Sequence, residues 1–170
     1  MIVKIVAYDF TWPAQFQAEA KVIKKAMGDN FVDIHHIGST SVPGLAAKPI
    51  IDIILVVKSL QILDENNAGM TEIGYVPKGE YGIPGRRYYQ KGGDHRTHQV
   101  HAFIENDNNI IRHIAFRDYL INNFNVCLEY AELKKKIAAE CNNNIDKYCD
   151  GKDRFVKYHE SIAMTLYKKK

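Results

Sequence analysis

Residues 36–57 read HIGSTSVPGLAAKPIIDIILVV, and this stretch decides the fold. Its second part, residues 49–57, is an almost continuous run of apolar and β-branched residues, which is typical of a central strand buried on both faces. Its first part, residues 38–48, is rich in glycine, serine, threonine and proline, as loops are. The preceding residues, 31–37, have the mixed polarity of a strand. The stretch therefore predicts two strands joined by a polar loop.

Asp52 is the one charged residue within the apolar run. Because side chains alternate along a strand, Asp52 shares its face with Ile50, Ile54 and Val56. An ionised carboxylate in apolar surroundings costs several kcal/mol unless a cation or strong donors face it. Two interpretations follow: a structural carboxylate held by backbone N–H groups or an arginine, or a carboxylate directed at a metal or a substrate. The loop that precedes Asp52 favours the second.

The loop offers backbone N–H groups and hydroxyls at close spacing, which suits a phosphate group. It is not a P-loop, because that motif has lysine directly after its second glycine, where this chain has Leu45 after Gly44. The candidate phosphate-binding residues of the loop are Gly38, Ser39, Thr40, Ser41 and Lys48.

Strands and helices alternate around this stretch, and helices follow to the end of the chain. Further strands are expected at 75–76, 86–91 and 97–105, the last two joined as a hairpin across Gly92-Gly93. Helices are expected at 12–27, 59–68, 111–122, 126–139 and about 153–167. The pattern predicts an α/β (α+β) fold with a small mixed sheet flanked by helices. We expect one domain over residues 1–170, with the sheet in about 1–108 and C-terminal helices in about 109–170.

Composition excludes several classes of protein. With 46% hydrophobic and 25% charged residues, the chain of 170 residues is neither disordered nor fibrous. A formal net charge of +3 argues against nucleic acid as a partner. No apolar run approaches the roughly 20 residues of a membrane span. The cysteines, Cys127, Cys141 and Cys149, form no CxxC pair and are expected to be reduced, which favours a cytoplasmic location.

A Gly-Ser pair that ends one strand, followed about a dozen residues later by a carboxylate on the next, resembles the nucleotidyltransferase superfamily of the DNA polymerase β type. A closer resemblance is to the GrpB family (UPF0157), whose hallmark segment is similar to residues 36–57. The flanking motifs that support it are Tyr8-Asp9-x-x-Trp12-Pro13, Phe116-Arg117-Asp118-Tyr119-Leu120, Tyr130-x-x-Leu133-Lys134 and Lys152-x-x-Phe155-Val156. The resemblance covers nearly the whole chain and implies a nucleotidyltransferase-like mixed sheet.

The superfamily places two carboxylates in an Asp-x-Asp pattern, and together they hold the Mg²⁺ ions that orient a nucleoside triphosphate. This chain has Asp52 followed by Ile54, so the second carboxylate of the pattern is missing. The resemblance implies Mg²⁺ as a candidate cofactor and a nucleoside triphosphate as a candidate substrate. Three alternatives stay open: another residue completes the site, the site holds one metal ion or none, or the domain binds without catalysing.

His101 is the first candidate to complete the site with Asp52, as a metal ligand or as a proton acceptor. It matches a histidine that is common in GrpB-like sequences, and a structural, hydrogen-bonded histidine is the alternative. His98 lies three residues away and therefore on the opposite strand face, so the two histidines should not share a metal ion. The aliphatic face of the expected strand, which should meet the core, comprises Val100, Ala102 and Ile104.

Further basic residues could neutralise a phosphate. Arg86 and Arg87 resemble part of a recurring segment of the family, and an arginine there could bind phosphate through two hydrogen bonds. Lys134 could also meet a phosphate, or it could belong to a solvated helix face together with the lysines beside it. The residues whose roles stay open are Glu80, Arg117, Asp118 and Tyr130.

The sequence thus predicts binding of a nucleotide or another phosphorylated small molecule at the loop 39–48. Metal-dependent nucleotidyl transfer to an unknown acceptor is the mechanistic hypothesis, with Mg²⁺ on Asp52 and assistance from His101. The alternative is a non-catalytic ligand-binding or protein-interaction module on a degenerate nucleotidyltransferase fold, which Ile54 favours.

Overall fold

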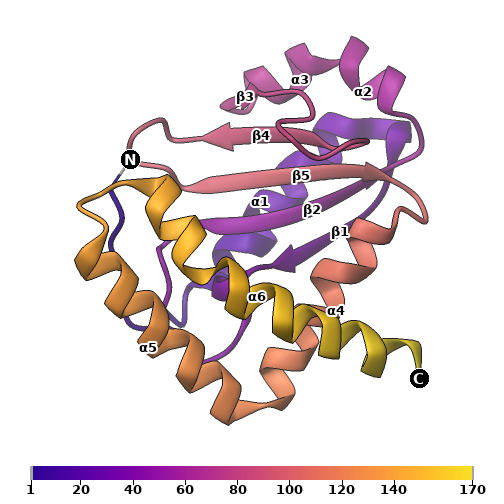
Figure 1. Ribbon diagram of the computed structural model, residues 1–170. Coiled ribbons are helices and arrows are strands. Elements are labelled where there is room, and N and C mark those ends of the chain that lie inside the picture. Colours follow the sequence, from indigo (N-terminus) through magenta and orange to yellow (C-terminus); the bar gives the residue numbers. More distant parts are fainter. Residues whose placement is uncertain (1, 170) are drawn as a thin grey trace.

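A five-stranded mixed sheet forms the centre of the computed structural model, which describes residues 2–169 (Figure 1). Its strand order is β1-β2-β5-β4-β3. The strands are β1 (Phe31–Ile37), β2 (Ile51–Val57), β3 (Tyr75–Pro77), β4 (Arg87–Lys91) and β5 (His98–Ile104). The α-helices are α1 (Trp12–Met27), α2 (Leu60–Glu65), α3 (Asn67–Glu72), α4 (Asn108–Asn122), α5 (Phe124–Glu140) and α6 (Ile145–Lys168). The predicted α/β fold with a mixed sheet and C-terminal helices is confirmed.

Strand β2 lies between β1, to which it is antiparallel, and β5, to which it is parallel. Asp52 is paired with Ile37 of β1 and with Gln99 of β5, and Ile54 is paired with His101. Paired residues on neighbouring strands point to the same face of a sheet, so Asp52, Gln99 and His101 share a face. Every residue of β2 except Asp52 is buried, which confirms the central strand predicted from residues 49–57.

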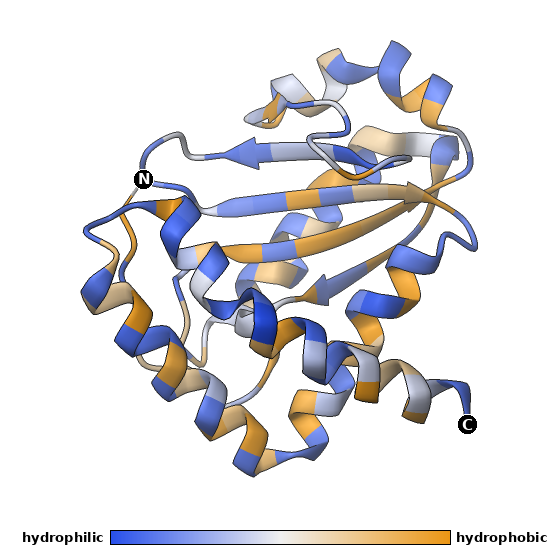
Figure 2. Ribbon diagram, in the orientation of Figure 1, coloured by the Kyte–Doolittle hydropathy of each residue, from blue (hydrophilic) through white to orange (hydrophobic). Residues whose placement is uncertain are grey.

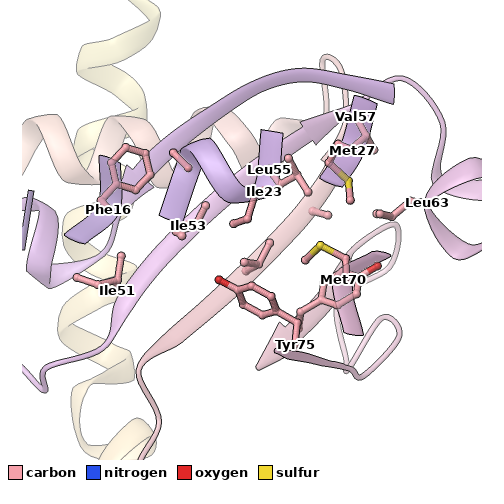
Figure 3. Packing of buried hydrophobic residues seen from close by; sticks show 14 of the residues in the cluster. Phe16, Ile23, Met27, Ile51, Ile53, Leu55, Val57, Leu63, Met70 and Tyr75 are labelled. Atoms are coloured by element: carbon pink, nitrogen blue, oxygen red, sulfur yellow. The ribbon is translucent and has the colours of Figure 1, made fainter. Parts of the chain in front are cut away.

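Helices α1 and α3 cover one face of the sheet and form the main core with it (Figures 1 and 3). The side chains that meet there include Phe16, Ile23 and Met27 from α1, Ile51, Ile53, Leu55 and Val57 from β2, and Met70 from α3. Their spacing in α1 follows the helical repeat, and in β2 it follows the alternation of a strand. Both periodicities were visible in the sequence, and both predictions are confirmed.

The opposite face of the sheet is apolar only in part. Its apolar part packs against α4 and consists of Ile37, Ile54, Val56 and Phe103 with Ile110. The other part carries the polar side chains Asp52, Gln99 and His101. Figure 2 shows β5 alternating between hydrophilic and hydrophobic residues along its length. Helices α5 and α6 lie on this side of the sheet, opposite α1 (Figure 1).

Helix α6 begins at Ile145, eight residues before the helix expected from about residue 153. Its N-cap is Asn144, whose side chain accepts a hydrogen bond from the backbone N–H of Lys147. Gly151 lies inside α6, where a Cβ would be 2.9 Å from Cγ2 of Ile137 on α5. The glycine thus allows close packing of α5 against α6.

Two other expectations are corrected. The helix expected over residues 59–68 is divided at Asn66 into α2 and α3, although Ser59 does cap α2 by accepting from the N–H of Ile62. Ile104, expected on the core face, is the last residue of β5 and is 43% exposed. None of the helices within residues 2–169 combines the length and the apolar character needed to cross a membrane.

Candidate functional site

A cleft of about 570 Å³ lies between the polar part of the sheet face and the helices α4, α5 and α6. The loop and strand segment singled out in the sequence forms one wall, through Gly38, Ser39, Thr40, Lys48 and Asp52. The opposite wall comes from the helices, and its charged members include Arg112, Lys134, Lys152 and Glu160. The volume lies within the usual range for small-molecule sites.

Gly38 brings the loop backbone against Asp52. Its φ is +73°, in the left-handed region that favours glycine, and a Cβ built there would lie 2.9 Å from Oδ2 of Asp52. Only glycine therefore allows this close approach between the Gly-Ser turn and the carboxylate.

Replacing Gly38 with alanine is expected to lower the free energy of unfolding by about 1–3 kcal/mol, because backbone strain and the collision with Asp52 add together. Gly44→Ala is the matched control. Gly44 also has a positive φ, of +83°, but no atom of residues 2–169 lies within 4 Å of a Cβ built there. Chemical denaturation should show a larger loss for Gly38→Ala than for Gly44→Ala, and equal losses would contradict the close approach.

Asp52 is held by hydrogen bonds from β5. Its Oδ1 lies 3.2 Å from Nε2 of His101, and the side-chain amide of Gln99, oriented so that its oxygen faces donors, donates to the same atom at 3.0 Å. Burial disfavours the carboxylate charge, but the hydrogen bond from His101 and the positive charges of Lys48 and Lys152 outweigh burial, so the pKa of Asp52 lies below its ordinary value. Asp52 is therefore an ionised acceptor at neutral pH.

Arg86 fixes the orientation of the His101 ring. Its Nη1 lies 3.3 Å from Nδ1 of His101, and because a guanidinium only donates, Nδ1 is the accepting nitrogen. The other ring nitrogen, Nε2, then carries the proton that is donated to Asp52. His101 therefore acts on Asp52 as a donor, which disfavours the role of proton acceptor expected for it.

Lys134 is the most unusual residue of the cleft. It is 1% exposed, and its Nζ has no hydrogen-bond partner within residues 2–169. The nearest aromatic group is the Tyr130 ring, whose centroid lies 4.6 Å from Nζ. Burial, and then the positive charges of Lys152 and Lys48, lower the pKa of Lys134 to about 6. Such a group favours a ligand that brings negative charge.

Lys48 and Lys152 flank a second aromatic ring, that of Tyr148. The ring centroid lies 4.7 Å from Nζ of Lys48 and 5.1 Å from Nζ of Lys152. Burial is the main cause that lowers the pKa of Lys48, and the charge of Lys152 adds to it. We call Lys48, Lys134 and Lys152 the lysine cluster.

The structure brings together most of the residues that the sequence singled out. The residues that line the cleft are Gly38, Ser39, Lys48, Asp52 and Lys134. His101 does not line it but lies within hydrogen-bond distance of Asp52. Lys134 lies on the cleft side of α5, not on a solvated helix face.

Thr40 and Ser41 are committed to the loop itself. The Thr40 hydroxyl lies 2.9 Å from Nε2 of His36 and donates to the Ile50 carbonyl, and the Ser41 hydroxyl donates to the Gly38 carbonyl. Thr40 borders the cleft, whereas Ser41 lies outside its lining. Their hydroxyls therefore shape the loop, and this corrects the expectation that both bind phosphate.

Arg86 and Arg87 also lie outside the cleft lining. Arg86 donates to the carbonyls of Glu80 and Tyr81 and so closes the loop before β4. Arg87 is paired with Ala102, on the α1 side of the sheet, and donates to both carboxylate oxygens of Asp64 at 2.8 and 3.1 Å. The expectation that Arg87 binds phosphate is therefore wrong, because adjacent strand residues face opposite ways.

The residues whose roles the sequence did not decide make contacts within the protein. Glu80 accepts from the backbone N–H of Gly85, and Arg117 donates to Asp118 and to the His36 carbonyl. Tyr130 borders the cleft and stacks on Phe155 of α6.

Several cleft residues were missed by sequence reasoning. Lys152 and Tyr148 had a visible signal, because the spacing Tyr-x-x-x-Lys occurs both at Tyr130 and Lys134 and at Tyr148 and Lys152. This spacing puts both side chains on one helix face. His113 had no such signal: it packs on His101 with ring centroids 5.7 Å apart, and burial followed by the charge of Arg112 lowers its pKa to about 3.

The donor set does not fit the two-metal site of the polymerase β pattern. Asp52 is a single carboxylate, the second position is the fully buried Ile54, and lysines stand nearby. Within the described part of the chain, no three histidine, cysteine, aspartate or glutamate side chains are grouped so that they could hold a metal ion. Hard cations such as Mg²⁺ need several oxygen ligands. We therefore derive no step through a metal ion.

The Gly-Ser turn between β1 and β2 and the carboxylate at the start of β2 lie together on a five-stranded mixed sheet flanked by helices. The family model described as GrpB protein matches residues 2–161, and the chain belongs to this family. The crystal structure of conserved protein GrpB from Enterococcus faecalis is 42% identical, with a TM-score of 0.92 over 96% of this chain and 99% of that chain.

Two curated relatives extend the comparison. UPF0157 protein YqkA of Bacillus subtilis (strain 168) is 45% identical over 161 residues, which are 95% of this chain and 47% of that protein. This chain therefore spans about half the length of that relative. Glutamate-rich protein GrpB of Alkalihalophilus pseudofirmus is 34% identical over 157 residues, which are 89% of this chain and 90% of that protein.

Proposed function

We propose that this protein binds a nucleotide or another phosphorylated small molecule in the cleft between the sheet and helices α4 to α6. The observation that carries the proposal is Lys134, a buried amine that points at the cleft and finds no acceptor in residues 2–169. A buried polar group without a partner costs free energy, and in native proteins such a group commonly serves a ligand. A phosphate group would supply the missing acceptor.

The wall of the cleft that residues 38–52 form supports the same proposal. Gly38 and Ser39 line the cleft at the turn, and Lys48 borders it from the same segment. Asp52 stands beside them as an ionised acceptor, suited to the hydroxyl group of a sugar or of a second substrate. The wall can therefore receive both a phosphate and a hydroxyl.

Two aromatic rings in the lining of the cleft favour a ligand with a flat base. Tyr81 and Tyr88 both line the cleft, and their rings are stacked with centroids 5.2 Å apart. Stacking on such rings is a common way to bind a nucleobase and tolerates different bases. This arrangement supports a nucleotide over a simple sugar phosphate.

The test is isothermal titration calorimetry with ATP, GTP, CTP and UTP, each compared with its unphosphorylated nucleoside. We expect at least one triphosphate to bind at least about 100-fold more tightly than its nucleoside, because the phosphates would contribute most of the free energy of binding. Equal affinities for nucleotides and nucleosides, or an absence of binding by all four triphosphates, would contradict the proposal.

A non-catalytic binding module is the second candidate, and the buried Ile54 favours it. Incubation with labelled triphosphates, with and without Mg²⁺ or Mn²⁺, distinguishes the two forms of the proposal. Turnover would support nucleotidyl transfer, whereas saturable binding without product would support the module.

A further inference from the structure

The lysine cluster gathers three amines from three separate elements around two tyrosine rings. Lys48 comes from the loop before β2, Lys134 from α5 and Lys152 from α6. Lys48 and Lys152 face the same ring, that of Tyr148, while Lys134 lies over Tyr130. Burial and the neighbouring positive charges therefore oppose protonation of Lys134 and Lys48 in the free protein, and a bound polyanion would relieve that opposition.

We infer that the cleft binds a phosphate chain through Lys48, Lys134 and Lys152 without a divalent metal ion. This inference rests on the proposed function and names the means by which the ligand's charge is neutralised. In the polymerase β pattern, metal ions held by two carboxylates neutralise that charge. Here the lysine cluster would neutralise the charge of the phosphate chain.

The surroundings of Asp52 favour lysines over a metal. Its Oδ1 already accepts from His101 and from Gln99, at 3.2 and 3.0 Å. The positive charges of Lys48 and Lys152 also stabilise the Asp52 carboxylate. A cation arriving at Asp52 would have to approach two ammonium groups. The negative charge of Asp52 is thus already stabilised by hydrogen bonds and positive charges of the protein.

Phosphate binding should also change the protonation of Lys134. The titratable groups that act on it are Cys127 and Tyr130 on its own helix, Lys152 on α6, and Lys48. With its pKa at about 6, Lys134 is mostly neutral near pH 7.5 in the free protein. A bound phosphate raises that pKa, so the complex should take up as much as about one proton.

The experiment is calorimetric titration of the full chain with sodium tripolyphosphate, in EDTA and in excess MgCl₂. We expect binding in EDTA with an affinity at least equal, within about threefold, to that in MgCl₂. We also expect the enthalpy near pH 7.5 to vary with the ionisation enthalpy of the buffer in the direction of proton uptake.

Binding that requires MgCl₂ would overturn the inference and leave the proposed function intact. No binding of tripolyphosphate in either condition would also overturn it, and the nucleotide titrations would then decide the proposed function separately. Metal-independent binding without proton uptake would overturn the role of Lys134. Because each measurement uses the unmodified protein, none depends on a variant that fails to fold.

Discussion

Replacing Lys134 with methionine is expected to stabilise the free protein and to weaken phosphate binding at least about 100-fold. Methionine has a similar length and needs no acceptor, so it removes the cost of burying an amine that finds no partner within residues 2–169. We expect the free energy of unfolding to rise by about 3–5 kcal/mol near pH 7, because the folded pKa of about 6 lies well below the ordinary 10.5. A gain in stability combined with a loss of binding is the mark of a residue kept for a ligand.

The stability gain should depend on pH with a defined sign. The pKa of Lys134 is about 6 in the folded protein and 10.5 in its ordinary state, so between these values the unfolded chain binds more protons. The free energy of unfolding of the unmodified protein therefore gains about 1.4 kcal/mol per pH unit from this group as pH rises. The advantage of Lys134→Met should be largest near pH 6 and should shrink towards pH 8.

Lys135→Met is the matched control, because Lys135 is exposed and contacts only the exposed Glu132, at 3.5 Å, among the described ion pairs. Denaturant titrations at several pH values, followed by calorimetry with tripolyphosphate, measure both effects. We expect Lys135→Met to change neither stability nor affinity appreciably. A destabilised Lys134→Met that still binds phosphate normally would show that Lys134 has a structural role.

Restoring the second carboxylate by Ile54→Asp should damage the fold instead of completing a metal site. Ile54 is fully buried and packs with Ile37, Val56 and Phe103. A carboxyl group there would have lost its hydration without gaining a cation, so we expect the free energy of unfolding to fall by about 3–5 kcal/mol at pH 7. Binding of tripolyphosphate in EDTA should not become dependent on Mg²⁺ in the fraction that stays folded.

Ile54→Asn separates the effect of charge from that of shape and polarity. The introduced carboxyl should have a raised pKa, so stability lost in Ile54→Asp should partly return as the pH falls through that pKa, whereas Ile54→Asn should show no such recovery. Denaturant titrations from pH 7 to pH 5 give this comparison. An Ile54→Asp protein as stable as the unmodified one, with tight Mg²⁺ binding, would contradict our description of the site.

The fold was largely predictable because its central part is encoded locally. Residues 49–57 carry the apolar composition of a buried strand, and Gly92-Gly93, at the start of the turn between β4 and β5, mark a reversal that the structure contains. The start of α6 was not predictable, because the role of Gly151 depends on Ile137 of α5, fourteen residues earlier in the sequence. The start of α6 therefore depends on a contact between two helices, which the local sequence pattern does not specify.

The candidate site was predictable on the sheet side and less so on the helical side. Asp52, Gly38 and Lys48 follow from a spacing that the chemistry of the loop constrains. Lys152 reaches the cleft only because α6 packs against α5, a contact that composition and periodicity do not specify. Arg87 was assigned wrongly because strand register, which decides the face of each residue, was unknown from the sequence.

The most direct test of the lysine cluster is a crystal structure of the protein with ATP bound in the presence of EDTA. We predict that phosphate oxygens lie within about 3 Å of Nζ of Lys134, with Lys48 and Lys152 contacting the same phosphate chain. The triphosphate bound elsewhere on the molecule, or bound in the cleft with Nζ of Lys134 still lacking an acceptor, would contradict this prediction.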